Sequence, residues 1–169
     1  MTPNEGLLIA RLVFGLVMAA HGAQKLFGWF GGYGIAGTGG YLESIGFRPG
    51  RFFALTSGFS ELASGILIAL GLFGPVGPAL MLSVMIVAAV SVHLKGGLFA
   101  QAGGIEVPLL YGTAAAALAL TGPGTLSLDA LLGITSIWTP AVIAASLAVG
   151  IIGAILTLGM RRQPEHVSA

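Results

Sequence analysis

Five long apolar runs, each bounded by glycine, proline or charge, are the feature that most constrains the fold of this chain. The runs cover residues 7–27, 52–73, 76–94, 107–120 and 138–160. A helix needs about 20 apolar residues to cross a hydrocarbon core roughly 30 Å thick. Only 8% of the 169 residues are charged, against roughly 25% in ordinary soluble domains. The sequence therefore predicts an all-α protein, a polytopic transmembrane helix bundle.

The distribution of positive charge predicts the orientation of this bundle. Basic residues favour cytoplasmic loops. If five helices alternate, six basic residues fall on one side, and Glu5 and Asp129 fall on the other. Those six are Lys25, Arg48, Arg51, Lys95, Arg161 and Arg162. We therefore expect a multi-pass membrane protein with its N-terminus outside and its C-terminus in the cytoplasm; four spans would break this agreement.

Two segments of the bundle are less regular than the rest. The fourth run has 14 residues, so we expect its helix to include Ile105 and Glu106 as well. Between the first two runs, a glycine-rich loop precedes residues 41–47, which resemble a short interfacial helix.

Ser146 and Gly150 form a small-xxx-small pattern in the fifth run. That pattern joins helices either within a bundle or between subunits, which leaves a homo-oligomer open.

The residue types that are missing exclude several kinds of chemistry. The chain has no cysteine, so it can supply no disulfide, iron–sulfur ligand or thiolate metal site. Any electron carrier would have to come from a partner or a bound cofactor. The formal net charge is only +1, which argues against nucleic-acid binding.

Ionisable side chains within the apolar runs are the candidate site residues. Each costs roughly 2.5–3.5 kcal/mol at the centre of a membrane helix, so each needs a partner or a wet cavity. The predicted topology brings most of them to the inner half of the membrane, on four different helices. We therefore expect a polar ligand-binding cavity there. The candidates are Arg11, His21, Lys25, Glu61, His93 and Glu106.

Helical geometry indicates which way some of these side chains face. At about 100° per residue, Arg11, His21 and Lys25 lie within an arc of about 80° on the first helix. On the second helix, Glu61 lies in a polar stripe with Ser57 and Ser64. Both patterns indicate faces that point into the bundle and not into lipid.

Plainer roles compete with a binding site. Lys25 and Lys95 lie close enough to helix ends to reach the interface with their charged tips. Glu61 could form a structural ion pair with Arg11 or with a histidine. Glu106 could cap the fourth helix. His21 and His93 on different helices invite bis-histidine haem ligation, but such a pair is a weak signal, and we expect neither haem nor a metal site.

Taken together, these residues resemble the DoxX family of small bacterial membrane proteins. The resemblance implies a four-helix membrane core over residues 1–130, with residues 131–169 forming an additional transmembrane helix and a short cytoplasmic tail. Relatives are parts of thiosulfate:quinone oxidoreductase, partners of redox enzymes, or factors in quinone and catechol detoxification. The resemblance rests on Arg11, on His21-Gly22-Ala23-Gln24-Lys25-Leu26-Phe27-Gly28, on Glu61, Gly65 and Leu70-Gly71-Leu72, and on His93, Glu106 and residues 122–129.

Three functions are compatible with these observations. The first is a membrane subunit of a redox system that binds a quinone in the inner-leaflet cavity, with a protein partner supplying electrons. His21 or Lys25 would donate to the quinone carbonyls, and Glu61 or Glu106 would exchange protons. The second is a non-catalytic accessory or assembly subunit of a larger membrane complex. The third is a small-solute or proton-coupled transporter.

Overall fold

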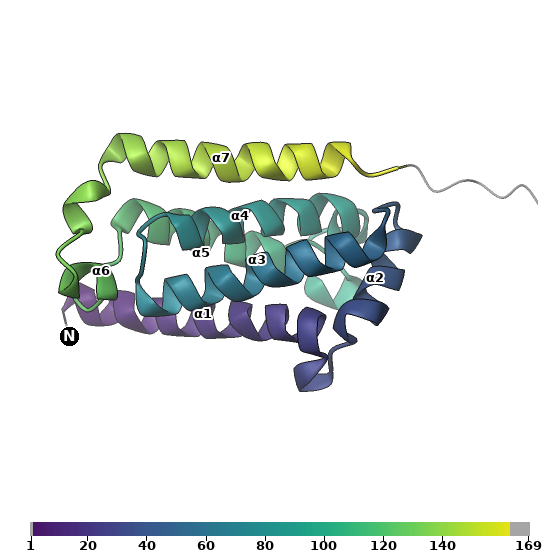
Figure 1. The fold of residues 1–169 in the computed structure, drawn as a ribbon, viewed down its shortest axis with the longest axis horizontal. Coiled ribbons are helices and arrows are strands. Elements are labelled where there is room, and N and C mark those ends of the chain that lie inside the picture. The colour runs from purple at the N-terminus through teal and green to yellow at the C-terminus, as the bar shows by residue number, and fades with distance from the viewer. Residues whose placement is uncertain (1, 163–169) are drawn as a thin grey trace, which may run out of the picture.

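The computed structural model describes residues 2–162, and all the regular structure in that range is helical (Figure 1). The remaining tail of the chain, residues 163–169, lies outside the described part. The α-helices are α1 (Pro3–Phe27), α2 (Gly34–Ser44), α3 (Gly50–Leu70), α4 (Val76–Ala88), α5 (Glu106–Thr121), α6 (Leu128–Leu131) and α7 (Pro140–Gly159). The shorter turns are η1 (Trp29–Gly31), η2 (Ala89–His93), η3 (Leu94–Gly96), η4 (Ala100–Ala102) and η5 (Thr135–Ile137).

Four helical segments between residues 2 and 162 are long and apolar enough to cross a membrane. They are α1, α3, the continuous stretch Val76–Gly96 and α7. The fourth predicted span corresponds to α5, which begins at Glu106 and has 16 residues. At 1.5 Å per residue α5 is about 24 Å long, shorter than a hydrocarbon core of roughly 30 Å. The predicted helical membrane bundle is confirmed, with one short member.

Helices α1 and α3 pack antiparallel through glycines on both sides of their contact. A Cβ on Gly15 would lie 2.7 Å from the backbone oxygen of Gly65, and one on Gly22 would lie 2.6 Å from that of Gly58. Real Cβ atoms do not approach backbone this closely, so only glycine fits. This glycine seam brings the side chains next to it on the two helices within reach of each other.

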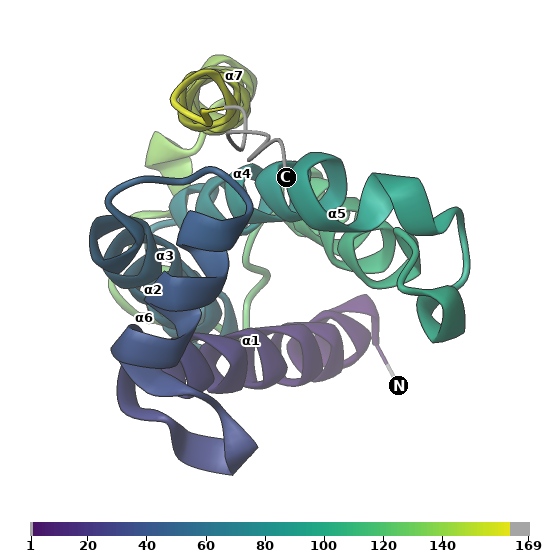
Figure 2. The same ribbon diagram turned by 90° about the vertical axis from the view of Figure 1, so that its right-hand side faces the viewer.

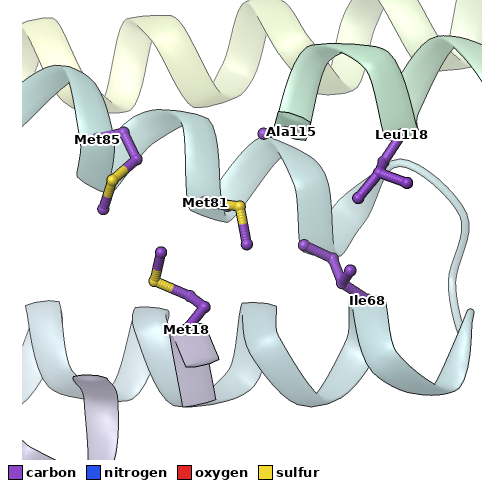
Figure 3. Close-up of a cluster of buried hydrophobic side chains, with 6 residues drawn as sticks. All are labelled: Met18, Ile68, Met81, Met85, Ala115 and Leu118. Carbon is purple, nitrogen blue, oxygen red and sulfur yellow. The ribbon is translucent and has the colours of Figure 1, made fainter. Parts of the chain in front are cut away.

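The apolar core lies where α1, α3, α4 and α5 meet. Figure 3 shows Met18 of α1 and Met81 and Met85 of α4 pointing toward one another. Methionine side chains are flexible and fill irregular gaps between helices. The other fully packed members are Ile68, Ala115 and Leu118.

Helix α7 lies along the outside of α4 (Figures 1 and 2). A Cβ on Gly150 would lie 2.5 Å from the backbone oxygen of Ala79, so the predicted small-residue pattern works here within the bundle. The end of α7 is fastened to the segment after α2. Arg161 Nε donates to the Ile45 oxygen over 2.7 Å, and Arg162 N donates to the Gly46 oxygen over 2.9 Å.

Helix α2 begins seven residues earlier than the interfacial helix expected at residues 41–47. The expected glycine-rich loop is therefore partly helical. Its glycines serve packing: a Cβ on Gly50 would lie 2.0 Å from the Gly39 oxygen, so α2 crosses the start of α3 almost backbone to backbone. A helix can contain this many poor helix formers because tertiary contact outweighs intrinsic propensity.

Candidate functional site

A cavity of about 320 Å³ lies at one end of the bundle, where α1, α2, α3, α4 and α7 converge. We call this the Lys25 end, because Lys25 lines the cavity, and the opposite end the Arg11 end. Part of the wall is apolar, including Phe47, Phe53 and Val87. The polar part is rich in hydroxyl groups: Thr38, Tyr41, Thr56, Ser57, Ser60, Ser83, Ser91 and Thr157.

Four of the eight hydroxyl groups of the wall are acceptors toward a ligand. Thr56, Ser57, Ser91 and Thr157 each donate to a backbone oxygen of their own helix. The hydroxyl hydrogen is used within the helix, and the oxygen lone pairs remain available. Such a wall suits a ligand that carries hydrogen-bond donors as well as an apolar ring.

Lys25 forms an ion pair with Glu61 across the glycine seam. The Glu61 side chain is only 4% exposed, whereas the Lys25 side chain is 31% exposed and lines the cavity. Gly58, one turn before Glu61, leaves space for the Lys25 stem, since a Cβ there would lie 3.2 Å from the Lys25 Cβ. The prediction that Glu61 faces the bundle is confirmed.

The second carboxylate oxygen of Glu61 is buried and has no hydrogen-bond partner. Ser64, the next polar residue of the stripe, is fully buried and donates to the Glu61 backbone oxygen over 3.0 Å. It therefore does not satisfy the carboxylate. A buried acceptor left unsatisfied carries a desolvation cost, and here it lies beside a lysine that reaches the cavity.

His93 lines the cavity and lies in the π-helical turn η2, which follows α4. Such turns are frequent at functional sites. The His93 Nδ1 atom lies 2.9 Å from the Gly103 oxygen. Nδ1 is therefore the donor, and Nε2 is an acceptor when the imidazole is neutral.

His21 and Glu106 are bound elsewhere and do not line the cavity. The His21 Nδ1 atom lies 3.2 Å from Gln24 Oε1, and its ring meets the edge of Tyr111 at 6.2 Å between centroids. Glu106 accepts from the backbone nitrogen of Ala100 over 2.8 Å. This hydrogen bond joins the start of α5 to η4, the turn before it. The role of Glu106 therefore extends beyond the capping of its own helix.

Arg11 lies at the opposite end of the bundle from the cavity. It is buried, and its guanidinium donates to the backbone oxygens of Pro123, over 2.7 Å, and of Leu126. Arg11 shares its helix face with Lys25 as predicted, but 14 residues separate them along α1, about 21 Å at 1.5 Å per residue. Arg11 and Lys25 therefore lie on one face of α1 but do not take part in one site.

Asp129 was not among the predicted site residues, although it is fully buried and its carboxylate accepts three hydrogen bonds. Its carboxylate accepts from Phe73 N over 2.8 Å, Gly74 N over 2.7 Å and Trp138 Nε1 over 2.7 Å. It joins the turn after α3 to the start of α7. Asp129 lies between the fourth and fifth apolar runs, so a search for ionisable side chains within those runs did not select it.

Of the six predicted residues, the structure places Lys25 and His93 in the cavity wall and Glu61 against Lys25, whereas Arg11, His21 and Glu106 lie elsewhere. No group of three or more His, Asp or Glu side chains that could hold a metal occurs within residues 2–162. Toward a ligand, the lysine can donate a hydrogen bond, and the hydroxyl oxygens and the imidazole can accept hydrogen bonds. The apolar part of the wall can enclose a ring.

These features define a helical integral membrane protein with an amphipathic cavity near one end of the bundle. Comparison with family models identifies the family: the DoxX model matches residues 6–94, which is more than half of the chain. The chain belongs to the DoxX family. The matched part ends just after His93, so α5, α6 and α7 lie outside it. Searches of curated proteins and of solved structures gave no match.

Proposed function

We propose that this protein is a membrane subunit of a redox system and binds the head group of a quinone or a similar small molecule in the cavity at the Lys25 end. The observation that carries the proposal is the pair Lys25–Glu61, which places a lysine, held by a buried acid, in the wall of a cavity that is otherwise lined by hydroxyls, apolar side chains and His93.

The size and chemistry of the cavity support a ring-sized ligand. Its volume, about 320 Å³, lies at the lower end of the roughly 300–1,000 Å³ typical of ligand pockets. That is suited to a head group whose tail remains in lipid. Lys25 Nζ would donate to one ring oxygen, and the hydroxyls and His93 Nε2 would accept from a reduced, hydroxylated ring. The free Glu61 oxygen offers a place for a proton.

Electrons would come from a partner protein or a bound cofactor in this proposal. The chain has no cysteine, and its described residues hold no metal-binding cluster. The family's association with redox enzymes makes a protein partner the natural source.

The proposed orientation places the Lys25 end in the cytoplasm. The structure gathers all six basic residues named above at the ends of α1, α4 and α7 and around the start of α3, and basic residues favour the cytoplasmic side. The protein would then lie in the inner membrane with its cavity in the cytoplasmic leaflet.

Ligand-induced thermal stabilisation tests the proposal. The purified protein in nanodiscs is titrated with short-chain menaquinone and ubiquinone analogues while its unfolding temperature is followed. We expect wild type to be stabilised, and Lys25→Gln to bind at least tenfold more weakly, because a hydrogen bond from a charged donor contributes about 1.5–3 kcal/mol.

Two variants serve as matched controls. Lys95→Gln removes a lysine at the same end that does not line the cavity, and His21→Ala removes a histidine bound outside it. Both are expected to respond like wild type. No response from wild type, or an equal response from Lys25→Gln, would overturn the proposal. If wild type failed to respond but copurified with a stoichiometric partner, the accessory-subunit interpretation would be favoured instead.

A further inference from the structure

An exposed group of aromatic side chains follows the end of α1. We call Phe27, Trp29, Phe30 and Tyr33 the aromatic hook. The exposed fractions of its last three members are 60%, 71% and 84%. The rings of Phe27 and Trp29 lie 5.0 Å apart between centroids, and those of Trp29 and Phe30 lie 6.4 Å apart. Side chains of this size are rarely left so open in water.

The backbone holds the hook in a defined shape. Phe30 has a φ of 52°, in the left-handed region that a bulky residue seldom adopts. Its carbonyl oxygen accepts from Gln24 Nε2 over 3.1 Å. Gly32 lies against the same residue, where a Cβ would be 2.4 Å from the Gln24 oxygen. The hook is therefore folded back against α1 instead of trailing away from it.

The position of the hook indicates what covers it. In Figure 1 the segment after α1 projects sideways from the bundle, across the direction of the long helices, at the level where α1 ends. A membrane helix of this length ends at the interface between lipid and water. A sideways projection at that level meets lipid head groups, whereas a water-borne partner would meet the surface beyond the helix ends.

The composition of the hook agrees with lipid. Residues 26–42 contain no charged side chain, although a protein-binding surface normally has a polar, solvated rim. Tryptophan and tyrosine concentrate at membrane interfaces, because an apolar ring enters the acyl region while its polar atom stays at the head groups.

We propose that the aromatic hook inserts into the head-group and carbonyl region of the surrounding phospholipid leaflet and fixes the depth of α1. Lys25 lies within one turn of the hook on the same helix. The hook therefore also sets the depth of the Lys25–Glu61 pair. The proposal does not depend on the identity of the cavity's ligand.

Tryptophan fluorescence tests this insertion, because the chain has only two tryptophans, Trp29 and Trp138. Wild type and Trp29→Phe are reconstituted in nanodiscs of phosphatidylethanolamine and phosphatidylglycerol, doped with phosphatidylcholine brominated either near the head group or near the chain end. The emission that Trp29→Phe lacks belongs to Trp29. We expect bromines near the head group to quench most of it, and deep bromines or aqueous iodide to quench little.

Phe59 provides a depth control, since it lies near the middle of α3 and is 67% exposed. In the chain with both Trp29→Phe and Phe59→Trp, the new emission should be quenched most by the deep bromines. If iodide quenches Trp29 strongly while bromolipids do not, the hook lies in water and the proposal is overturned. Protection from all quenchers would mean that protein covers the hook, either a second copy or a partner, and would overturn it as well.

Discussion

At the scale of single residues, the Lys25–Glu61 pair is the contact whose removal should have the largest effect near the cavity. Glu61→Gln leaves a cation without its partner in a largely buried place, while the 31% exposure of the Lys25 side chain gives that cation partial access to water. We expect Glu61→Gln to lower the free energy of unfolding by about 1–3 kcal/mol, between the values typical of exposed and of buried ion pairs.

A double-mutant cycle separates this pair from its surroundings. Lys25→Met alone should also destabilise, but Lys25→Met combined with Glu61→Gln should lose less than the sum of the two. Stability is measured by unfolding in mixed micelles of increasing dodecyl sulfate content. Lys95→Met, at the same end and exposed, is the control and should change little. Strict additivity would show that the pair contributes no coupling.

Asp129 gives a second residue-scale prediction, at the Arg11 end. Asp129→Asn keeps the shape but removes one acceptor and turns an amide toward donors, which disturbs three hydrogen bonds. We expect a loss of about 2–4 kcal/mol. Trp138→Phe removes the indole donor and part of its ring but leaves both backbone hydrogen bonds to Asp129, so it should lose less, about 1–2 kcal/mol. Chemical unfolding of both variants measures the difference, and equal losses would contradict this account.

The candidate residues could be named from the sequence, but the sequence could not tell which of them lie near one another. Hydropathy and helical period predicted that Arg11, Lys25 and Glu61 lie on inward faces, and the structure confirms this. Their partners depend on the axial offset between helices, which periodicity does not contain. Arg11 therefore meets loop carbonyls at one end, while Lys25 meets Glu61 at the other. The hydroxyls of the cavity wall lie on four helices, and each is unremarkable in its own segment.

At the scale of helices, the glycine seam between α1 and α3 makes a sharp prediction. Gly22→Ala would place a Cβ 2.4 Å from the Leu62 backbone nitrogen, so the helices must separate. We expect a loss of about 2 kcal/mol or more, within the range of overpacking effects. Gly6→Ala is the matched control in the same helix, because a Cβ there meets nothing within 4 Å. It should be neutral or stabilise by about 0.5–1 kcal/mol. Equal effects in unfolding assays would contradict the close packing.

The long apolar helices were predictable, whereas their interruptions were not. Length and hydropathy gave α1, α3 and α7 to within a few residues, because a bilayer demands such runs. Helix α2 contains glycines that intrinsic propensity counts as breakers, and only its contact with α3 explains it. The π turn in residues 89–93 likewise leaves no mark in the sequence.

At the scale of the whole molecule, charge asymmetry predicts how the bundle lies in its membrane. Six of the seven basic residues, all but Arg11, lie at the Lys25 end, so we expect a C-terminal green fluorescent protein fusion to fluoresce in cells and a C-terminal alkaline phosphatase fusion to be inactive. The two fusions share one junction and control for each other. An active phosphatase fusion would reverse the orientation and place the cavity in the outer leaflet.

The π turn divides the stretch Val76–Gly96 into two parts that follow one axis. Side chains after the turn point in directions that differ from those of an uninterrupted α-helix. The first part directs its methionines at the core, and the second carries His93, which lines the cavity. A single inserted position can therefore aim one end of a helix independently of the other. Shortening the turn by one residue would rotate everything after it by about 100° and leave the methionine core in place, so that packing and ligand contact at this helix can change separately.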